Sequence, residues 1–250
     1  MEKWKTSISK SDDKETLVRG YELLDLIGNL SFSEAVCLLL KGELPKENES
    51  KMLDAILVAC IEHGINPPSI TSARASVSAG NPVNAALAAG MLGFGEFHGG
   101  AIEQSAKMMQ ENVDRNPADV VKRFKEQGKR IPGYGHAVYK DEDPRTAKLF
   151  SLAEEYGVAG KYVEFAHGIK DAIDSVLGKT LCINIDGAIA ALISEMVFDW
   201  RIGKGLFAIP RSVGMLAHIH EEMVNEKPYR RITDDQIEYT GPAKKQFKRQ

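Results

Sequence analysis

Apolar residues recur at helical spacing along most of the chain, and capping residues flank many of these runs. Ser31 is a favourable N-cap for residues 32–41 (FSEAVCLLLK), Glu34 completes a capping-box pattern, and Gly42 marks the end. The predicted helices span residues 32–41, 49–63, 82–92, 101–112, 117–127, 143–156, 161–176, 187–200 and 210–226. This pattern predicts a nearly all-α protein.

The predicted helix over residues 49–63 has an apolar face and a glycine directly after its end. Met52, Ile56 and Cys60 lie on one face of a helix over residues 49–63, and Gly64 is the expected C′ glycine behind it.

Other segments carry weaker or different signals. Pro117 and Pro144 stand where the first turn of a helix accepts proline, and the alanine-rich run 82–92 is expected deep in the helical core. Residues 180–185 (TLCINI) are the best strand candidate, but a run this short could equally be a buried turn or the start of a helix.

Composition and charge narrow the class of protein without deciding its function. The chain has 250 residues, of which 43% are hydrophobic and 27% are charged, and its net charge is -3. This balance gives no reason to expect nucleic acid or membrane as a partner, although a local basic patch could hold an anionic cofactor.

Cysteine usage and the N-terminus favour a cytoplasmic protein. Cys37, Cys60 and Cys182 are odd in number and widely spaced, so we expect buried reduced thiols and neither a disulfide framework nor a zinc site. No apolar segment follows Met1, and no run approaches the roughly 18 apolar residues of a membrane span.

Glycine-framed polar residues mark candidate chemistry at three places. His98 lies in GFGEFHGGA (93–101), His136 in IPGYGHAVYKDEDPR (131–145) and Asp186 in INIDG (183–187). Glycine lets a ligand approach closely, a histidine can stabilise an enol or donate to a carbonyl oxygen, and a carboxylate can move a proton at a carbon beside a thioester. Arginines can bind the carboxylates of such a substrate in a bidentate fork. The arginines at loop and helix ends that suit this task are Arg145, Arg211 and Arg231.

Each of these residues also has a plain structural interpretation. His98 alone could be a turn residue, Asp186 alone could be the N-cap of a following helix, and the arginines alone could be surface residues. His218 and His220 are two positions apart and do not share a helix face, so we predict no metal site there.

The order of the motifs resembles the citrate synthase superfamily. The resemblance covers residues 17–242 and is most specific at GYGHAVYKDEDPR, with HGGA before it and NID, PRSVGMLAHIHEE and YTGP after it. It implies an all-α, citrate synthase-like helical fold with a large domain (1–100 and 197–250) and a small domain (101–196). The chain is short for a citrate synthase, and its compact form resembles stand-alone citryl-CoA lyase, the relative of the C-terminal module of ATP-citrate lyase.

The resemblance also implies roles for individual residues. His98 would stabilise the enol of acetyl-CoA, His136 would hydrogen-bond the carbonyl of oxaloacetate, and Asp186 would shuttle the methyl proton. The expected substrate-binding residues are His63, Arg145, Arg211 and Arg231, the last supplied by the neighbouring subunit of a homodimer or higher homo-oligomer. Ile232 stands where the family pattern usually has proline, so either Arg230 or Arg231 could reach the site.

A CoA thioester is the implied substrate, and no metal or bound cofactor is expected. The segment implied to hold CoA comprises Lys129, Arg130, Gly133, Tyr134 and Gly135, with the two basic side chains suited to its phosphates. The glycine-rich loops 93–100 and 133–135 are the expected hinges for closure of the domains.

The expected activity is cleavage of citryl-CoA to acetyl-CoA and oxaloacetate, as in the reductive tricarboxylic acid cycle. The alternatives are citrate synthase, a synthase or lyase for a methylcitryl or citramalyl thioester, and a non-catalytic CoA-binding module.

Overall fold

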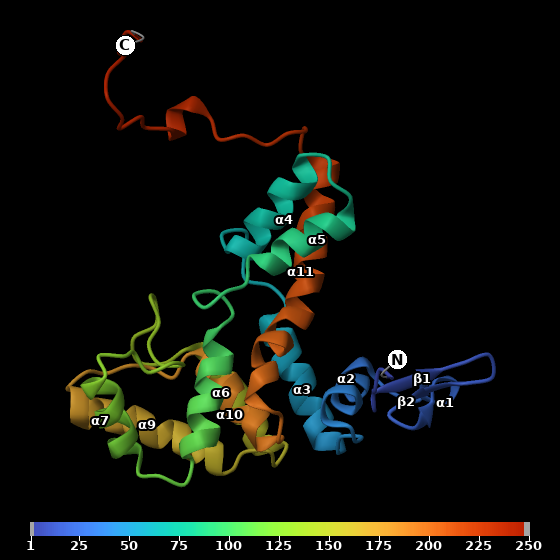
Figure 1. The fold of residues 1–250 in the computed structure, drawn as a ribbon. Coiled ribbons are helices and arrows are strands. Elements are labelled where there is room, and N and C mark those ends of the chain that lie inside the picture. Colours follow the sequence, from blue (N-terminus) through green and yellow to red (C-terminus); the bar gives the residue numbers. More distant parts are fainter. Residues whose placement is uncertain (1–2, 248–250) are drawn as a thin grey trace.

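The structure is a computed structural model, which describes residues 3–247 and is mostly helical (Figure 1). The N-terminal part contains β1 (Ser9–Ser11), β2 (Thr16–Val18), β3 (Tyr21–Glu22), α1 (Leu23–Leu26), α2 (Phe32–Lys41) and α3 (Glu47–Cys60). The middle contains α4 (Pro68–Ser78), α5 (Val83–Leu92), α6 (Ala101–Asn112), α7 (Pro117–Glu126), α8 (Pro144–Glu155) and α9 (Lys161–Leu177). The C-terminal part contains α10 (Ile185–Glu195), the 3₁₀ turn η1 (Trp200–Ile202), α11 (Gly203–Asn225) and a second 3₁₀ turn, η2 (Asp234–Gln236).

Capping chemistry fixes several helix ends as the sequence predicts. The Ser31 side chain accepts from the backbone N–H of Glu34, and the Glu34 carboxylate accepts from the backbone N–H of Ser31, so α2 begins with a complete capping box. Gly42 ends α2 in the left-handed conformation, at a φ of 93°. Pro117 and Pro144 occupy the first turns of α7 and α8, as expected.

Other helix boundaries differ from the prediction. Helix α3 ends at Cys60, so Gly64 lies beyond it in the turn to α4. Helix α10 starts at Ile185 and ends at Glu195, earlier than expected at both ends. Helix α11 starts at Gly203 and runs through Pro210, because packing of both helix halves offsets the backbone hydrogen bond that a proline lacks.

Helix α4 was not predicted from the sequence, whereas the predicted helix over residues 82–92 is present as α5 but is less buried than expected. Helix α4 buries Ile70, Ala73 and Val77 on one face, but serine and threonine between them hide the periodicity. Helix α5 buries only Ala86 and Gly90, so the expectation that its alanine-rich run lies deep in the core is wrong.

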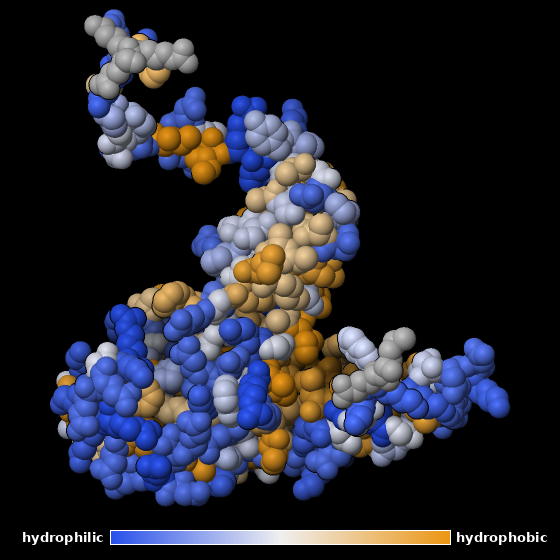
Figure 2. All heavy atoms as spheres, in the orientation of Figure 1, coloured by the Kyte–Doolittle hydropathy of each residue, from blue (hydrophilic) through white to orange (hydrophobic). Residues whose placement is uncertain are grey.

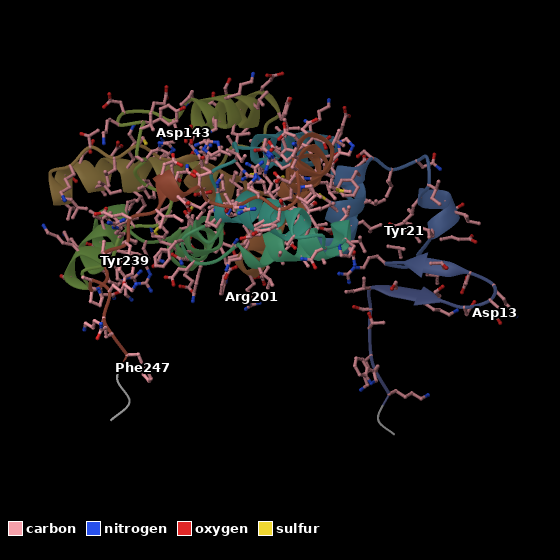
Figure 3. All side chains as sticks on the ribbon, turned by 90° about the horizontal axis from the view of Figure 1, so that it is seen from above. Asp13, Tyr21, Asp143, Arg201, Tyr239 and Phe247 are labelled. Carbon is pink, nitrogen blue, oxygen red and sulfur yellow. The ribbon has the colours of Figure 1, made fainter. Side chains whose placement is uncertain are left out.

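Sheet structure occurs where no strand was predicted. Strands β1, β2 and β3 form an antiparallel sheet in that order, and Figure 3 shows it at one end of the helical body, with Asp13 and Tyr21 labelled. Each strand is two or three residues long, too short for a period-two pattern to register. The candidate strand 180–185 makes one isolated bridge, between Ile183 and Tyr134, and then enters α10.

The helices pack in two groups joined by α11. Helices α6, α7, α9 and α10 surround each other, and residues 187–194 of α10 are all buried among them. Helices α4 and α5 pack together against α11, which also contacts α3 and α6 (Figure 1). After α11, the chain leaves this body as an extended tail that carries Tyr239 and Phe247 (Figures 1 and 3).

Apolar surface is unevenly distributed over the molecule. Figure 2 shows orange, apolar atoms gathered along the column formed by α5 and α11, while the lobe of α6, α7 and α9 is mostly hydrophilic on the same face. In the part of the chain that is described, none of the helices has both the length and the apolar character that crossing a membrane requires.

Candidate active site

Six of the predicted site residues line a single cavity, about 220 Å³ in volume. They are His63, His98, His136, Arg145, Asp186 and Arg211. The lining comes from the end of α3, the loop before α6, the loop before α8, the start of α10 and the middle of α11. Residues far apart in the sequence thus meet at one place, as the hydrogen bond between Arg211 and Cys60, 151 positions apart, illustrates.

His98 is held at the cavity by a hydroxyl group and two aromatic rings. Its Nε2 lies 2.8 Å from the Oγ of Ser69, and its ring centroid is 5.0 Å from that of Phe94 and 6.0 Å from that of Phe207. Burial lowers the pKa of His98, and the positive charge of Arg211 lowers it further. His98 is therefore a neutral imidazole at neutral pH, which can share a proton with an enol oxygen.

The backbone fixes the tautomer of His136. Its Nδ1 accepts from the N–H groups of Val138 at 3.1 Å and Tyr139 at 3.2 Å, and the Tyr139 ring stacks on the imidazole with centroids 4.7 Å apart. Because Nδ1 is the acceptor, the proton of the neutral ring is on Nε2. His136 is thus prepared to donate a hydrogen bond to a substrate oxygen.

Asp186 lies in the first turn of α10 but does not cap it. The N-cap is Asn184, whose side chain accepts from the N–H of Gly187. Within residues 3–247, no hydrogen bond to the Asp186 carboxylate is found. Burial raises the pKa of Asp186, while the charge of Arg145 opposes that shift. A carboxylate with a raised pKa and no competing partner is suited to carrying a proton to and from carbon.

Asp143 is a buried residue of the site that the sequence analysis did not single out. Its side chain is fully buried and accepts from Nε of Arg145 at 3.0 Å, from Nη2 of Arg145 at 2.8 Å and from the backbone N–H of Ile185 at 3.2 Å. Burial would raise the pKa of Asp143, but the hydrogen bonds from Arg145 and Ile185 bring it below its usual value. Asp143 thus holds both the guanidinium of Arg145 and the backbone of Ile185, the residue before Asp186. The Asp-Pro pair at a helix start was the available signal, since Asp143 is also the N-cap of α8.

Arg211 and His63 also line the cavity. Arg211 is 3% exposed, its Nε donates to the carbonyl of Cys60 at 2.9 Å, and its guanidinium lies 4.8 Å from the centre of the Phe207 ring. Burial lowers the pKa of His63, and Arg145 and Arg211 lower it further, so this imidazole is also neutral at neutral pH. Two guanidinium groups against one carboxylate make a cavity that favours an anionic ligand.

Part of the segment expected to hold CoA is exposed, and part of it is buried in the core. Lys129 and Arg130 are exposed, as a phosphate contact requires. Tyr134 is 8% exposed and its hydroxyl donates to the carbonyl of Ala166, so its side chain belongs to the core and only its backbone can face a ligand. Gly133 packs so closely against Gly187 that a Cβ at either glycine would collide with the other's backbone.

The loop 133–135, one of the two expected hinges, is hydrogen-bonded to the segment that leads into α10. Gly133 accepts from the N–H of Asn184 at 3.0 Å, and the N–H of Gly135 donates to Cys182 at 2.8 Å. Both partners lie within residues 101–196, the predicted small domain.

Arg231 lies outside this cavity, on the tail behind α11. Its guanidinium is 5.1 Å from the centre of the Tyr229 ring. Arg230 is instead bound to this chain, with hydrogen bonds to Glu222 and an ion pair with Glu226.

All three cysteines are buried and unpaired, as expected. Cys60 lines the cavity, but burial raises the pKa of its thiol to about 12, so it is not a thiolate at neutral pH.

Comparison with known proteins places this geometry in a family. Residues 45–232 match the family model described as "Citrate synthase, C-terminal domain". The chain belongs to the citrate synthase family. The resemblance and the helical fold predicted from the sequence are thereby confirmed.

Solved structures of this family cover the chain to different extents. Citryl-CoA lyase from Hydrogenobacter thermophilus matches with a TM-score of 0.94 and 49% identity, covering 98% of this chain and 97% of that one. An ATP citrate lyase from Methanosaeta concilii matches in fold, with a TM-score of 0.83 and 24% identity over 97% of this chain and 42% of that one.

Curated relatives are longer than this chain. The glyoxysomal citrate synthase of Cucurbita maxima is 33% identical over 227 residues, which is 85% of this chain and 43% of that protein. A probable ATP-citrate synthase of Dictyostelium discoideum is 30% identical over 240 residues, which is 88% of this chain and 36% of that protein. The chain thus spans less than half the length of these two relatives.

Proposed function

We propose that this member of the citrate synthase family is a citryl-CoA lyase, which cleaves citryl-CoA to acetyl-CoA and oxaloacetate. The observation that carries the proposal is the meeting of His98, His136 and Asp186 with Arg145 and Arg211 in one cavity. The similarity to the lyase of Hydrogenobacter thermophilus over nearly the full length of both chains supports it.

Substrate binding follows from the charges around the cavity. Arg145, held in plane by Asp143, and Arg211, held by the Cys60 carbonyl, would bind the carboxylates of citryl-CoA. Lys129 and Arg130, which are exposed, would contact the phosphates of CoA. Backbone groups of Gly133, Tyr134 and Gly135 would complete that subsite.

Cleavage then requires two proton movements. Nε2–H of His136 donates to the hydroxyl oxygen as it becomes the carbonyl oxygen of oxaloacetate. Because the tautomer makes His136 a donor, another group must take the hydroxyl proton, and the carboxylate of Asp186, which lines the same cavity, is suited to that step. The carbon–carbon bond breaks as His98 lends a proton to the thioester oxygen, which gives the enol of acetyl-CoA. Asp186 then delivers the hydroxyl proton to the methylene carbon, and the enol oxygen returns its proton to His98.

The same residues serve condensation in the reverse direction, so they do not select a lyase over a synthase. The test is purified protein with synthetic citryl-CoA, with all four possible products measured. Acetyl-CoA with oxaloacetate supports the lyase, while citrate with free CoA reveals hydrolysis and a citrate synthase. Parallel reactions with methylcitryl-CoA and citramalyl-CoA test the related substrates. A chain that neither turns over these thioesters nor changes its melting temperature with CoA is a non-catalytic module.

We further propose that the active unit is a homodimer or a higher homo-oligomer. Exposed apolar side chains follow α5 and α11, including Leu92 at 85% and Val224 at 65% exposure (Figure 2). A patch of this kind favours a protein interface. The tail behind α11 leads away from its own body, so Arg231 would reach the cavity of a neighbouring subunit (Figure 1). Arg230 is unsuited to that role because Glu222 and Glu226 hold it at the end of α11.

We also propose the division into two domains that the family resemblance implies. Residues 101–196 would form the small domain, with Asp186 and the CoA-side loop, and residues 1–100 with 197–250 would form the large domain. Closure about the loop 93–100 would shield the enol from water. A cytoplasmic location and a part in the reductive tricarboxylic acid cycle stay predictions from the sequence.

A further inference from the structure

The turn that presents His63 is shaped by the carboxylate of its neighbour, Glu62. One oxygen of Glu62 accepts from the backbone N–H of His63 at 2.8 Å and from the backbone N–H of Gly64 at 2.6 Å. Helix α3 has ended at Cys60, so these backbone groups have no helical partner. The carboxylate therefore sets the direction in which the chain, and with it the His63 side chain, leaves the helix.

A histidine of α11 holds the same carboxylate from the other side. Nε2 of His218 lies 3.2 Å from the Glu62 oxygen that accepts the two backbone N–H groups. Gly214, one helical turn before His218, lets this approach happen, because a Cβ there would collide with Glu62 and with the carbonyl of Ile61.

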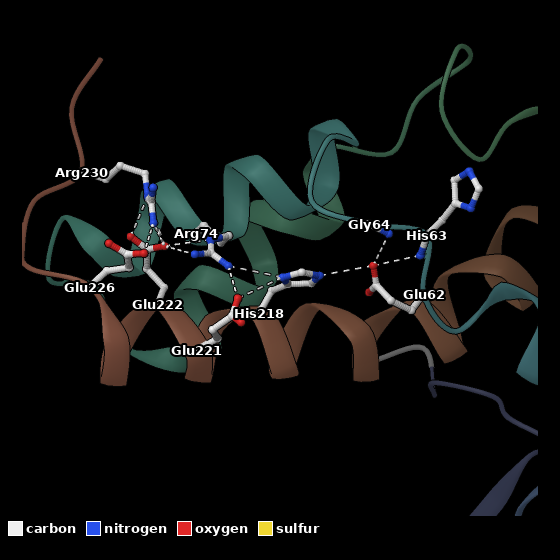
Figure 4. Close-up of polar contacts among 9 residues, drawn as sticks. All are labelled: Glu62, His63, Gly64, Arg74, His218, Glu221, Glu222, Glu226 and Arg230. Atoms are coloured by element: carbon white, nitrogen blue, oxygen red, sulfur yellow. Dashed lines mark hydrogen bonds and ion pairs between the residues drawn. The ribbon is translucent and has the colours of Figure 1, made fainter. Parts of the chain in front are cut away.

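His218 is in turn fixed by a row of charged residues along α11 (Figure 4). Its Nδ1 faces Nη1 of Arg74 at 3.4 Å and a carboxylate oxygen of Glu221 at 3.8 Å. Arg74, which is 5% exposed, pairs with Glu221 and with Glu222, and Glu222 pairs with Arg230. We name this row the α11 ladder; it comprises Glu62, Arg74, His218, Glu221, Glu222, Glu226 and Arg230.

The donors and acceptors of the ladder have one consistent order. Arg74 has only N–H donors, so Nδ1 of His218 is the acceptor and Nε2 carries the proton. Nε2–H then donates to Glu62, and Glu62 accepts from the turn. A single orientation of the His218 ring satisfies both neighbours.

We propose that Glu62 is a positioning residue for His63 and that His218 fixes Glu62 through the α11 ladder. The proposal rests on the proposed function, in which His63 contacts the dicarboxylate part of the substrate. Glu62 does not line the cavity, and its side chain is 37% exposed, so it acts on the substrate only through the turn. A partly exposed carboxylate adds little to stability, so its loss acts on binding more than on folding.

The first experiment compares Glu62→Ala with Glu62→Gln in steady-state cleavage of citryl-CoA. Alanine removes the acceptor of both backbone N–H groups, so KM should rise about tenfold with a smaller change in kcat, as is common for groups that orient a ligand-binding residue. Glutamine keeps an acceptor oxygen and should recover most of the loss. Equal defects in the two variants, or unchanged kinetics in Glu62→Ala, would overturn the proposal.

The second experiment is a double-mutant cycle with His63→Ala. If Glu62 acts through His63, then Glu62→Ala should change the affinity for oxaloacetate about tenfold in the wild type but less than twofold in the His63→Ala background. Affinity is measured by titration calorimetry, which needs no turnover. Additive effects, or wild-type protein that does not bind oxaloacetate, would overturn the positioning role. A wild-type protein that does not cleave citryl-CoA would instead overturn the proposed function, so the two failures are distinguishable.

Variants on α11 keep the test valid if the turn variants do not fold. His218→Gln should raise KM severalfold without changing the melting temperature by more than a few degrees. His220→Gln is the matched control, because His220 is exposed, two residues along the same helix and outside the ladder. Equal kinetics for these two variants would show that His218 does not support Glu62.

Discussion

Two walls of the cavity present the substrate-binding groups, and they are built in different ways. The α10 wall comprises His136, Asp143, Arg145 and Asp186, and its organiser is a carboxylate with no exposed surface. The α11 wall comprises His63 and Arg211, and its turn is held by the α11 ladder, whose Glu62, Glu221 and Arg230 side chains are 37%, 54% and 46% exposed.

This difference matches the work that each wall would do. The α10 wall would place a proton donor against one carbon atom, where a displacement of about 1 Å can cost 100-fold in rate. Buried, backbone-anchored groups hold such a geometry. The α11 wall would hold carboxylates, and a pair of charged groups tolerates small shifts because Coulomb attraction changes slowly with distance. The following variants test whether the two walls differ in this way.

Asp186→Asn should have the largest effect on catalysis. It removes the proton carrier, so the cleavage rate should fall by about 1,000-fold or more. The melting temperature should rise, because a buried carboxyl with a raised pKa destabilises the fold above that pKa, and the amide carries no such charge. Activity assays and calorimetry at neutral pH measure both. Near-normal activity would remove Asp186 from the mechanism.

Asp143→Ala should come next, and it should affect activity and stability together. It leaves the Arg145 guanidinium and the Ile185 N–H without their buried acceptor, so kcat/KM should fall about 100-fold and stability by about 3 kcal/mol. Denaturant unfolding and steady-state kinetics test it. If Asp143→Ala raises KM no more than Glu62→Ala does, the two walls do not differ in rigidity.

Arg231→Met and Arg230→Met should separate the tail's functional residue from its structural one. Arg231→Met should raise KM about tenfold if the guanidinium binds a carboxylate in the neighbouring subunit. Arg230→Met should mainly loosen the tail, because it removes the partner of Glu222. Mixing Arg231→Met with Asp186→Asn subunits provides the control, since a shared site would regain activity in mixed dimers. No regain would place Arg231 outside the partner's site.

The pH dependence of stability should give the smallest effect. The pKa of Asp143 is lowered in the folded protein, so its stabilisation is present above the unfolded value of 3.8 and is lost as the pH falls through the folded value. The difference in unfolding free energy between wild type and Asp143→Asn should therefore shrink as the pH falls below 3.8. A constant difference over this range would argue that the ion pair with Arg145 is not formed.

The local pattern determined most of the helices. Ser31 with Glu34 and Pro144 with Asp143 act within a few residues of themselves, so α2 and α8 begin where short-range chemistry directs. Three cavity motifs, at His98, His136 and Asp186, could be found because glycine beside a polar residue is visible in the sequence itself.

Tertiary structure decided the remaining features of the site, because these features depend on contacts between distant segments. The hydrogen bonds between Gly133 and Asn184, and between Asp143 and Ile185, join the loop 133–135 and the start of α8 to the start of α10. The tautomer of His136 depends on backbone N–H groups that only a folded loop supplies. Asp143 and His218 lie within recognised motifs, but the roles of Asp143, Glu62 and His218 became evident only once burial and hydrogen-bond partners were fixed in space.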